Sequence, residues 1–146
     1  MADSVSEQWA YPPNWDGNPP SKNGWRRVVK MIRCLSDGTG ESDVIKLDIS
    51  ELKCLNGSVP TRTAIEFISY SIKDIDSVVL EWDRAEREKI AVLPGNSDGE
   101  FDFMKFGGLI DPGEAGDRTG DILLTSNGCS VNGVYNILIA VRLKER

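Results

Sequence analysis

Residues 63–94, TAIEFISYSIKDIDSVVLEWDRAEREKIAVLP, constrain the fold most, because apolar and polar residues alternate along them. The alternation occurs in three short runs, at residues 64–70, 78–83 and 90–93. A period of two places successive side chains on opposite faces of a pleated strand, so each run can bury one face. The charged segment 83–89 is too short for the crossover helix that parallel strands need. These residues therefore predict a meander of antiparallel strands.

Further strands are predicted at residues 25–35, 43–49, 121–125 and 135–143, and the last of them places Tyr135, Ile137, Ile139 and Val141 on one face. Turns are predicted at residues 36–40, 127–128 and 132–133, and Ser50 is expected to cap a single helical turn. About seven or eight short strands with frequent turn signals are typical of an antiparallel β-sandwich or jelly roll. The expected fold class is therefore all-β.

The first 24 residues differ in character from the rest of the chain. Pro12, Pro13, Pro19 and Pro20 lie there, out of 7 prolines in the sequence. Proline lacks an amide donor and restricts its predecessor to extended geometry, so residues 1–24 are predicted to form an extended arm outside the sheet. Residues 25–146 are predicted to form a single domain. The arm carries three aromatic residues, which either fold back on this domain or insert into a partner: Trp9, Tyr11 and Trp15.

Residues 95–120 are predicted to form a long loop, and connections of this length are often functional. Phe101, Phe103 and Phe106 are expected to pack part of the loop against the domain. Charges of opposite sign on the loop and on the first predicted strand can pair with neighbouring molecules, although a solvated face is the alternative interpretation. The candidates for such contacts are Arg26, Arg27, Lys30, Asp111 and Asp117.

The sequence contains no histidine, which excludes Ser-His and Cys-His nucleophile pairs and histidine-ligated metal sites. Its 3 cysteines are far apart, so neither a disulfide framework nor a zinc site is expected. Alternating oxygen ligands at residues 96–102 faintly resemble a calcium loop but lack its spacing. A carboxylate pair for glycoside hydrolysis stays open because acidic residues are plentiful, but no two of them stand out. We expect no catalytic residue, no cofactor and no metal ion.

Two bulk properties limit the partners. The net charge of −6 argues against a sequence-independent grip on nucleic acid phosphates. No apolar run approaches the roughly 20 residues that span a bilayer, so no membrane partner is expected. Residues 1–15 lack the basic and apolar parts of a secretory signal, and synthesis and assembly in a cytoplasm are the expectation.

Several stretches together resemble a group of small virion structural proteins of tailed bacteriophages: LSDGTGESD at 35–43, ISY at 68–70, VLEWD at 79–83, FDFMKFGGL at 101–109, TGDILLT at 119–125 and the ending at 135–144. The resemblance covers roughly residues 25–144. It implies a head decoration or cement protein on the capsid surface, which binds the major capsid protein as a dimer or trimer. It carries over no catalytic residue. The alternatives are a carbohydrate-binding, lectin-like module and a tail or head–tail-joining protein.

Overall fold

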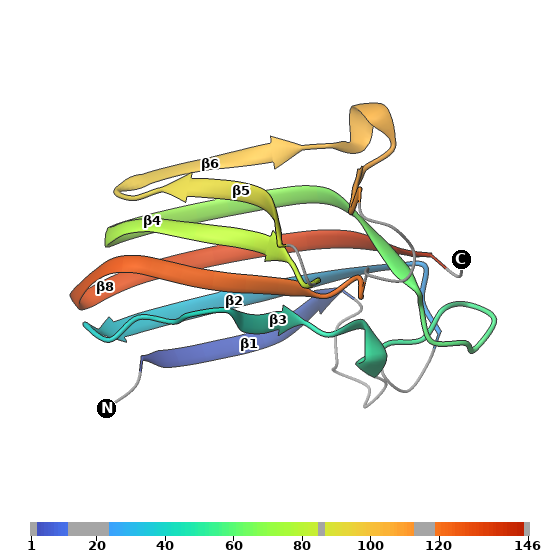
Figure 1. Ribbon diagram of the computed structural model, residues 1–146, viewed down its shortest axis with the longest axis horizontal. Helices are drawn as coiled ribbons and strands as arrows, with labels where there is room; N and C mark the ends of the chain where they lie inside the picture. Colours follow the sequence, from blue (N-terminus) through green and yellow to red (C-terminus); the bar gives the residue numbers. More distant parts are fainter. Residues whose placement is uncertain (1–2, 12–23, 85–86, 113–118, 145–146) are drawn as a thin grey trace.

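The computed structural model describes residues 3–11, 24–84, 87–112 and 119–144, and strands dominate those ranges (Figure 1). The strands are β1 (Ser4–Tyr11), β2 (Arg27–Asp37), β3 (Val44–Leu47), β4 (Arg62–Trp82), β5 (Glu88–Pro94), β6 (Ser97–Asp102), β7 (Leu109–Ile110) and β8 (Ile122–Lys144). Two short 3-10 turns, η1 (Ile49–Glu51) and η2 (Met104–Phe106), are the helical elements of the described ranges. The prediction of an all-β, antiparallel fold is confirmed.

Strands β4 and β8 are the two longest and organise the sheet. They pair with each other from Arg62 opposite Lys144 to Trp82 opposite Ile122. β2 pairs with the other edge of the second part of β8, and β1 extends the sheet beyond β2. β5, β6 and β7 all pair with β4, and β3 pairs with the first part of β8. All pairs are antiparallel and belong to one sheet of 8 strands.

Both long strands bend sharply at a corner. The register slips there, because residues 130–133 of β8 lie opposite Asp74 alone. Asp74 and Asn132 have positive φ values of 59° and 68°. A Cβ atom on Gly133 would lie 2.6 Å from the carbonyl oxygen of Asp74, so the two strands approach closely only because that residue is glycine. A bulge of this kind bends a strand without ending its pairing.

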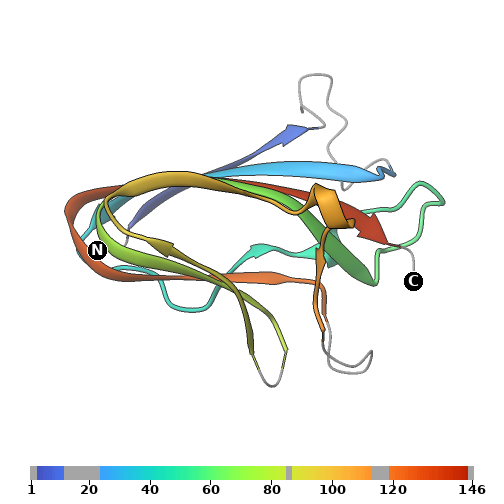
Figure 2. The same ribbon diagram turned by 90° about the horizontal axis from the view of Figure 1, so that it is seen from above.

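The corner folds the sheet into two layers that lie over each other, joined where β4 and β8 bend (Figure 2). We call them the β2 layer (β1, β2, β6, β7, residues 62–73 of β4 and 134–144 of β8) and the β5 layer (β3, β5, residues 75–82 of β4 and 122–129 of β8). Their facing side chains form one hydrophobic cluster, which includes Ile137 and Ile139 from one layer and Leu80 and Trp82 from the other. The prediction that Tyr135, Ile137, Ile139 and Val141 share one face is confirmed, and this face points into the core.

The prediction of many short strands is wrong in two places. The run at 64–70 and residues 78–82 of the second run belong to the single strand β4, so only the second and third runs form a hairpin, β4 with β5. Likewise, residues 122–125 and 135–143 of the two predicted strands lie on the single strand β8. The Asn-Gly pairs that predicted chain reversals sit at the corner, where positive φ values bend the ladder without reversing it. Among the described residues, the strand pairing therefore runs through one folded sheet and not through a sandwich of two separate sheets.

The predicted arm is also wrong over Ser4–Tyr11, which form β1 and pair with β2. This part of the arm precedes Pro12, so every residue of β1 keeps its amide donor. The rest of the predicted arm, residues 12–23, lies outside the described residues.

The predicted loop at 95–120 likewise contains structure. Asn96, at a φ of 52°, turns the chain from β5 into β6, and η2 and β7 follow. Asp48, not Ser50, caps the helical turn η1: its side chain accepts a hydrogen bond from the Ser50 amide at 3.0 Å.

Candidate interaction surface

The outer face of the β2 layer is a broad sheet surface made by neighbouring strands. On β8 the even-numbered residues from Asn136 to Arg142 face outward, because their odd-numbered neighbours fill the core. Met31 on β2 lies opposite Leu138, and Ser69 on β4 lies opposite Leu138 from the other side. The alternation of each strand thus contributes one row of side chains to this face.

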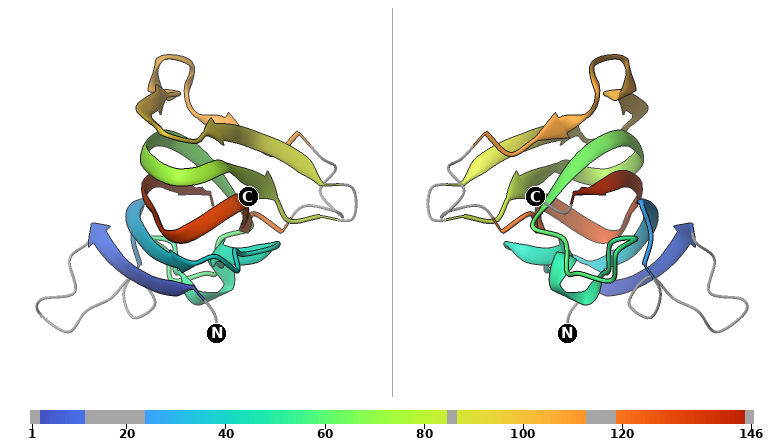
Figure 3. Two further views of the ribbon diagram at one scale, coloured as in Figure 1. Left: turned by 90° about the vertical axis from the view of Figure 1, so that its left-hand side faces the viewer. Right: turned by 90° about the vertical axis from the view of Figure 1, so that its right-hand side faces the viewer.

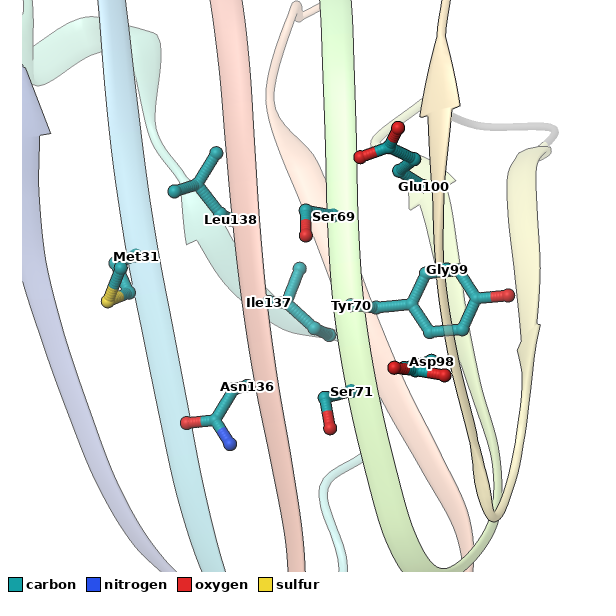
Figure 4. Close-up of a pocket in the computed structure, with 10 residues that line it drawn as sticks. All are labelled: Met31, Ser69, Tyr70, Ser71, Asp98, Gly99, Glu100, Asn136, Ile137 and Leu138. Atoms are coloured by element: carbon teal, nitrogen blue, oxygen red, sulfur yellow. The ribbon is translucent and has the colours of Figure 1, made fainter.

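The middle of this face is hollowed into a groove of about 530 Å³, which we call the central groove (Figure 4). The short side chains of Ser69 and Ser71 form its floor, with Asn136 and Leu138 on one side. Serine leaves a depression because its neighbours on the adjacent strands have longer side chains. The Tyr70 ring lies over Gly99 of β6, where a Cβ atom would be 2.9 Å from the tyrosine hydroxyl.

Carboxylates border the central groove along β6. Asp98, Glu100 and Asp102 lie opposite Ser71, Ser69 and Phe67 of β4, and β6 forms the margin of the layer (Figure 3). We call these three residues the acidic rim. Asp102 also accepts a hydrogen bond from the Met104 amide at 2.9 Å.

Serine hydroxyls, an amide and carboxylates around an open groove suit a partner that presents several hydrogen-bond donors. The size lies within the range of about 300–1,000 Å³ that is common for ligand sites. A sheet surface held by continuous backbone pairing on both sides is also rigid. The arrangement can therefore bind a surface loop, an extended peptide or a sugar.

A second groove, of about 430 Å³, lies at the end of the same layer near the C-terminus. We call it the basic groove; its lining residues are Trp25, Arg26, Cys54, Leu55, Arg62, Arg142, Leu143 and Lys144. The predicted contact residue Arg26 is exposed in this groove. Arg27 lies beside it and forms an ion pair with Glu66 at 2.7 Å.

Two other predicted contact residues do not face solvent. Lys30 points between the layers, where its ammonium lies 2.7 Å from a Glu7 carboxylate oxygen and 2.5 Å from the carbonyl oxygen of Lys46. Asp111 is 5% exposed and pairs with Arg84 at 3.1 Å. Both charges are thus paired within the chain, and a contact of either residue with a neighbouring molecule stays a prediction. Asp117 lies outside the described residues.

The aromatic residues predicted as partner anchors lie in different surroundings. Trp9 packs against the core of its own domain, with the Lys30 ammonium 5.2 Å from its ring centroid. Tyr11 is 50% exposed and meets Trp25 edge to face, with ring centroids 5.9 Å apart. Trp15 lies outside the described residues. Of the two described residues, only Tyr11 offers substantial surface to a partner.

The three phenylalanines form a row of rings with Tyr70. Phe101 stacks on Tyr70 at 6.0 Å, Phe103 stacks on Phe101 at 6.0 Å, and Phe106 meets Phe103 edge to face at 5.9 Å. Phe101 and Phe103 pack against the core, as predicted, although Phe101 belongs to β6 and not to a loop. Phe106 is 66% exposed, so its predicted packing is limited to the contact with Phe103.

A polar cluster between the layers was missed by sequence reasoning. The Lys46 ammonium is buried and lies 2.5 Å from Glu41 and 3.7 Å from Glu7. The Tyr135 hydroxyl donates a hydrogen bond to the other oxygen of Glu41. Burial, and then Glu41, raise the pKa of Tyr135, so the hydroxyl stays a donor. The alternation of residues 43–49 did not identify Lys46 as buried, because it does not reveal the register shift between Ile45 and Leu47.

A carboxyl group near η1 was also missed as a titrating group. Burial, and to a smaller extent the negative charges of Asp48, Asp83 and Glu51, raise the pKa of Asp121 to about 6. The hydrogen bond that Asp121 accepts from the Ile49 amide at 2.9 Å acts in the opposite direction.

Within the described ranges, no group of three or more cysteine, aspartate or glutamate side chains is placed to hold a metal ion. The acids at 98–102 follow one strand face and do not converge. None of the helical elements in those ranges has the length and apolar character that crossing a membrane requires.

Comparisons with protein families, curated proteins and solved structures give no significant match to this chain.

Proposed function

We propose that this chain is a non-enzymatic structural protein of a bacteriophage particle, which binds the major capsid protein and stabilises the head shell. The outer face of the β2 layer is the contact surface in this proposal. The observation that carries it is the central groove, an open and hydrogen-bonding surface on a rigid sheet. The resemblance of residues 25–144 to small virion proteins supports the particle setting.

The repeated binding sites of a capsid allow a surface with few polar contacts to bind tightly. A capsid repeats the same site many times, and an oligomer that contacts several sites gains affinity without new contacts. A small number of polar contacts per copy is then sufficient. The protein needs a scaffold that keeps its shape, which the folded sheet and its single hydrophobic cluster provide.

Binding to purified heads that lack this protein tests the proposal. Replacing Ser69 with tyrosine fills the floor of the central groove while keeping a residue that is favourable in strands. We expect Ser69→Tyr to weaken co-sedimentation with heads about tenfold or more, the effect of losing roughly 1.4 kcal/mol. The matched control is Ser77→Tyr, which lies on the same strand but in the β5 layer. Equal binding by Ser69→Tyr and the wild type would contradict the proposed contact surface.

A carbohydrate-binding role is the second candidate, because Ser69, Ser71, Asn136 and the acidic rim offer the hydrogen-bonding groups that a sugar needs. A glycan array with the wild type and Ser69→Tyr distinguishes the two. Binding of one glycan class that Ser69→Tyr abolishes supports this role, and an array with no binder eliminates it. A position at the tail or the head–tail junction remains the alternative within the particle.

A further inference from the structure

Positive charges meet across neighbouring strands at the end of the β2 layer. Arg27 of β2 lies directly opposite Arg142 of β8, and Lys144 of β8 lies directly opposite Arg62 of β4. Like charges in directly opposite positions destabilise a sheet. The register thus concentrates cations on three adjacent strands.

The described residues supply little negative charge to Arg26, Arg27, Arg142 and Lys144. Glu66 lies 2.7 Å from Arg27 but 3.9 Å from Arg142, whose other nitrogen donates to the carbonyl oxygen of Gly107 at 3.0 Å. Within the described ranges, neither Arg26 nor Lys144 has a carboxylate within ion-pair distance. Burial, and then the charges of Arg142 and Arg62, lower the pKa of Lys144, consistent with a site of positive potential.

The basic groove also has a donor without an acceptor. The indole nitrogen of Trp25, a lining residue, is buried and has no hydrogen-bond partner among the described residues. Buried donors are normally paired, because an unpaired one costs about 1–3 kcal/mol. A bound group that brings carboxylate oxygens would complement both the cations and this donor.

The acidic rim is a suitable source of carboxylates on the same molecule. Asp98, Glu100 and Asp102 alternate along one face of β6, so neighbouring carboxylates are about 7 Å apart. Arg142 and Lys144 alternate along β8 with the same repeat. Asp98 and Glu100 of the rim lie far from the basic groove of their own chain, because they are opposite Ser71 and Ser69 of β4, at least about 17 Å along the strand from Ala64, the residue opposite Arg142.

We propose that the basic groove binds the acidic rim of a second copy of this chain. Each copy carries both surfaces, so all the contacts are satisfied in a closed ring, of which a two-fold dimer is the smallest. The net charge of −6 disfavours the alternative occupant, a nucleic acid. The inference does not depend on the proposed function, since it concerns the purified protein alone.

Light scattering coupled to size exclusion measures the mass in solution. We expect a multiple of 16.1 kDa at low ionic strength and the monomer at about 0.5 M salt, because salt screens exposed charges. A groove variant, Arg26→Glu with Lys144→Glu, avoids the two arginines that contact Glu66. A rim variant, Asp98→Lys with Glu100→Lys, makes the complementary change. Each variant alone should associate at least about tenfold more weakly.

Mixing the two variants should restore association, because each supplies the surface that the other has lost. The matched control is Lys73→Glu with Lys89→Glu, which changes the net charge from −6 to −10, as the groove variant does, but leaves both surfaces intact. Circular dichroism checks that all variants fold. A wild type that is monomeric at low salt, or variants that do not complement each other, would overturn the inference. Either result would overturn it even if the groove bound phosphate or oligonucleotide probes.

Discussion

Replacing Lys46 with methionine tests the polar cluster between the layers. Methionine has nearly the same length and volume, so the change removes a charge without opening a large cavity. Glu41 then still accepts the hydrogen bond from the Tyr135 hydroxyl, but it loses its ion pair with the Lys46 ammonium, which lay 2.5 Å away. The side chain of Glu41 is only 9% exposed, so water cannot replace that contact.

The expected loss in the free energy of unfolding follows from the burial of Glu41. Removing one partner of a buried ion pair costs about 3–5 kcal/mol, because the other charge remains uncompensated. We expect Lys46→Met to lower the free energy of unfolding by about 3 kcal/mol, since Lys30 stays nearby and offsets part of the loss. Domains are stable by roughly 5–15 kcal/mol, so the variant should still fold.

A double variant separates this effect from lost packing. Glu41→Gln in the Lys46→Met background removes the second charge and leaves an amide oxygen that can still accept the Tyr135 hydroxyl. The double variant should recover about 2 kcal/mol of the loss, because replacing both partners of a buried pair is often nearly neutral. Lys89→Met, on the exposed face of β5, should change stability by less than about 0.5 kcal/mol.

Urea unfolding, followed by the fluorescence of the buried Trp82, gives these free energies. With a slope of about 1–3 kcal/mol per molar urea, Lys46→Met should lower the midpoint by about 1–3 M. A loss below about 1 kcal/mol, or a double variant no more stable than Lys46→Met, would refute the argument that Lys46 and Glu41 form a coupled buried pair.

Three further perturbations test other parts of the structure. Because the pKa of Asp121 is raised to about 6 from an unfolded value near 3.8, the folded state binds more protons between these pH values. The stability that Asp121 contributes should therefore fall by about 1 kcal/mol as the pH rises from 4 to 6, after allowance for solvent screening. The variant Asp121→Asn should lack this component in the pH profile of its Tm. Gly133→Ala places a Cβ atom 2.6 Å from the Asp74 carbonyl and should cost about 1–3 kcal/mol in urea unfolding. Ser130→Ala at the same corner is exposed and should be near neutral, and equal effects of the two changes would argue against close packing at the corner. Burial raises the pKa of the Cys34 thiol to about 12 and Cys54 is 2% exposed, so a thiol reagent at pH 8 should modify half-buried Cys129 first, and uniform reaction of all three thiols would contradict this.

The sequence predicted the parts of the fold that depend on local alternation. The inward face of residues 135–143 follows from a period of two, which every half-buried strand shows. The same pattern does not tell whether a strand ends or bends between two runs. Asn132 and Gly133 have the composition of a turn, but residues 130–133 form a bulge because β4 continues opposite them. That outcome depends on pairing between distant segments and is not a local property.

The candidate surfaces were predictable only in part, for a related reason. Arg26 and Arg27 were chosen by charge, and both are exposed at the end of the β2 layer. Lys30, four residues after Arg26, points between the layers because β3 and β1 provide partners there. The central groove combines side chains from β2, β4, β6 and β8, so no single stretch of sequence carries a signal for it.

A cryo-electron microscopy map of the phage particle that carries this chain tests the proposed function most directly. We predict density for the folded sheet on the outside of the head, with the central groove of the β2 layer turned towards the major capsid protein. Density at the tail, or on the head with the β5 layer against the shell, would contradict this account.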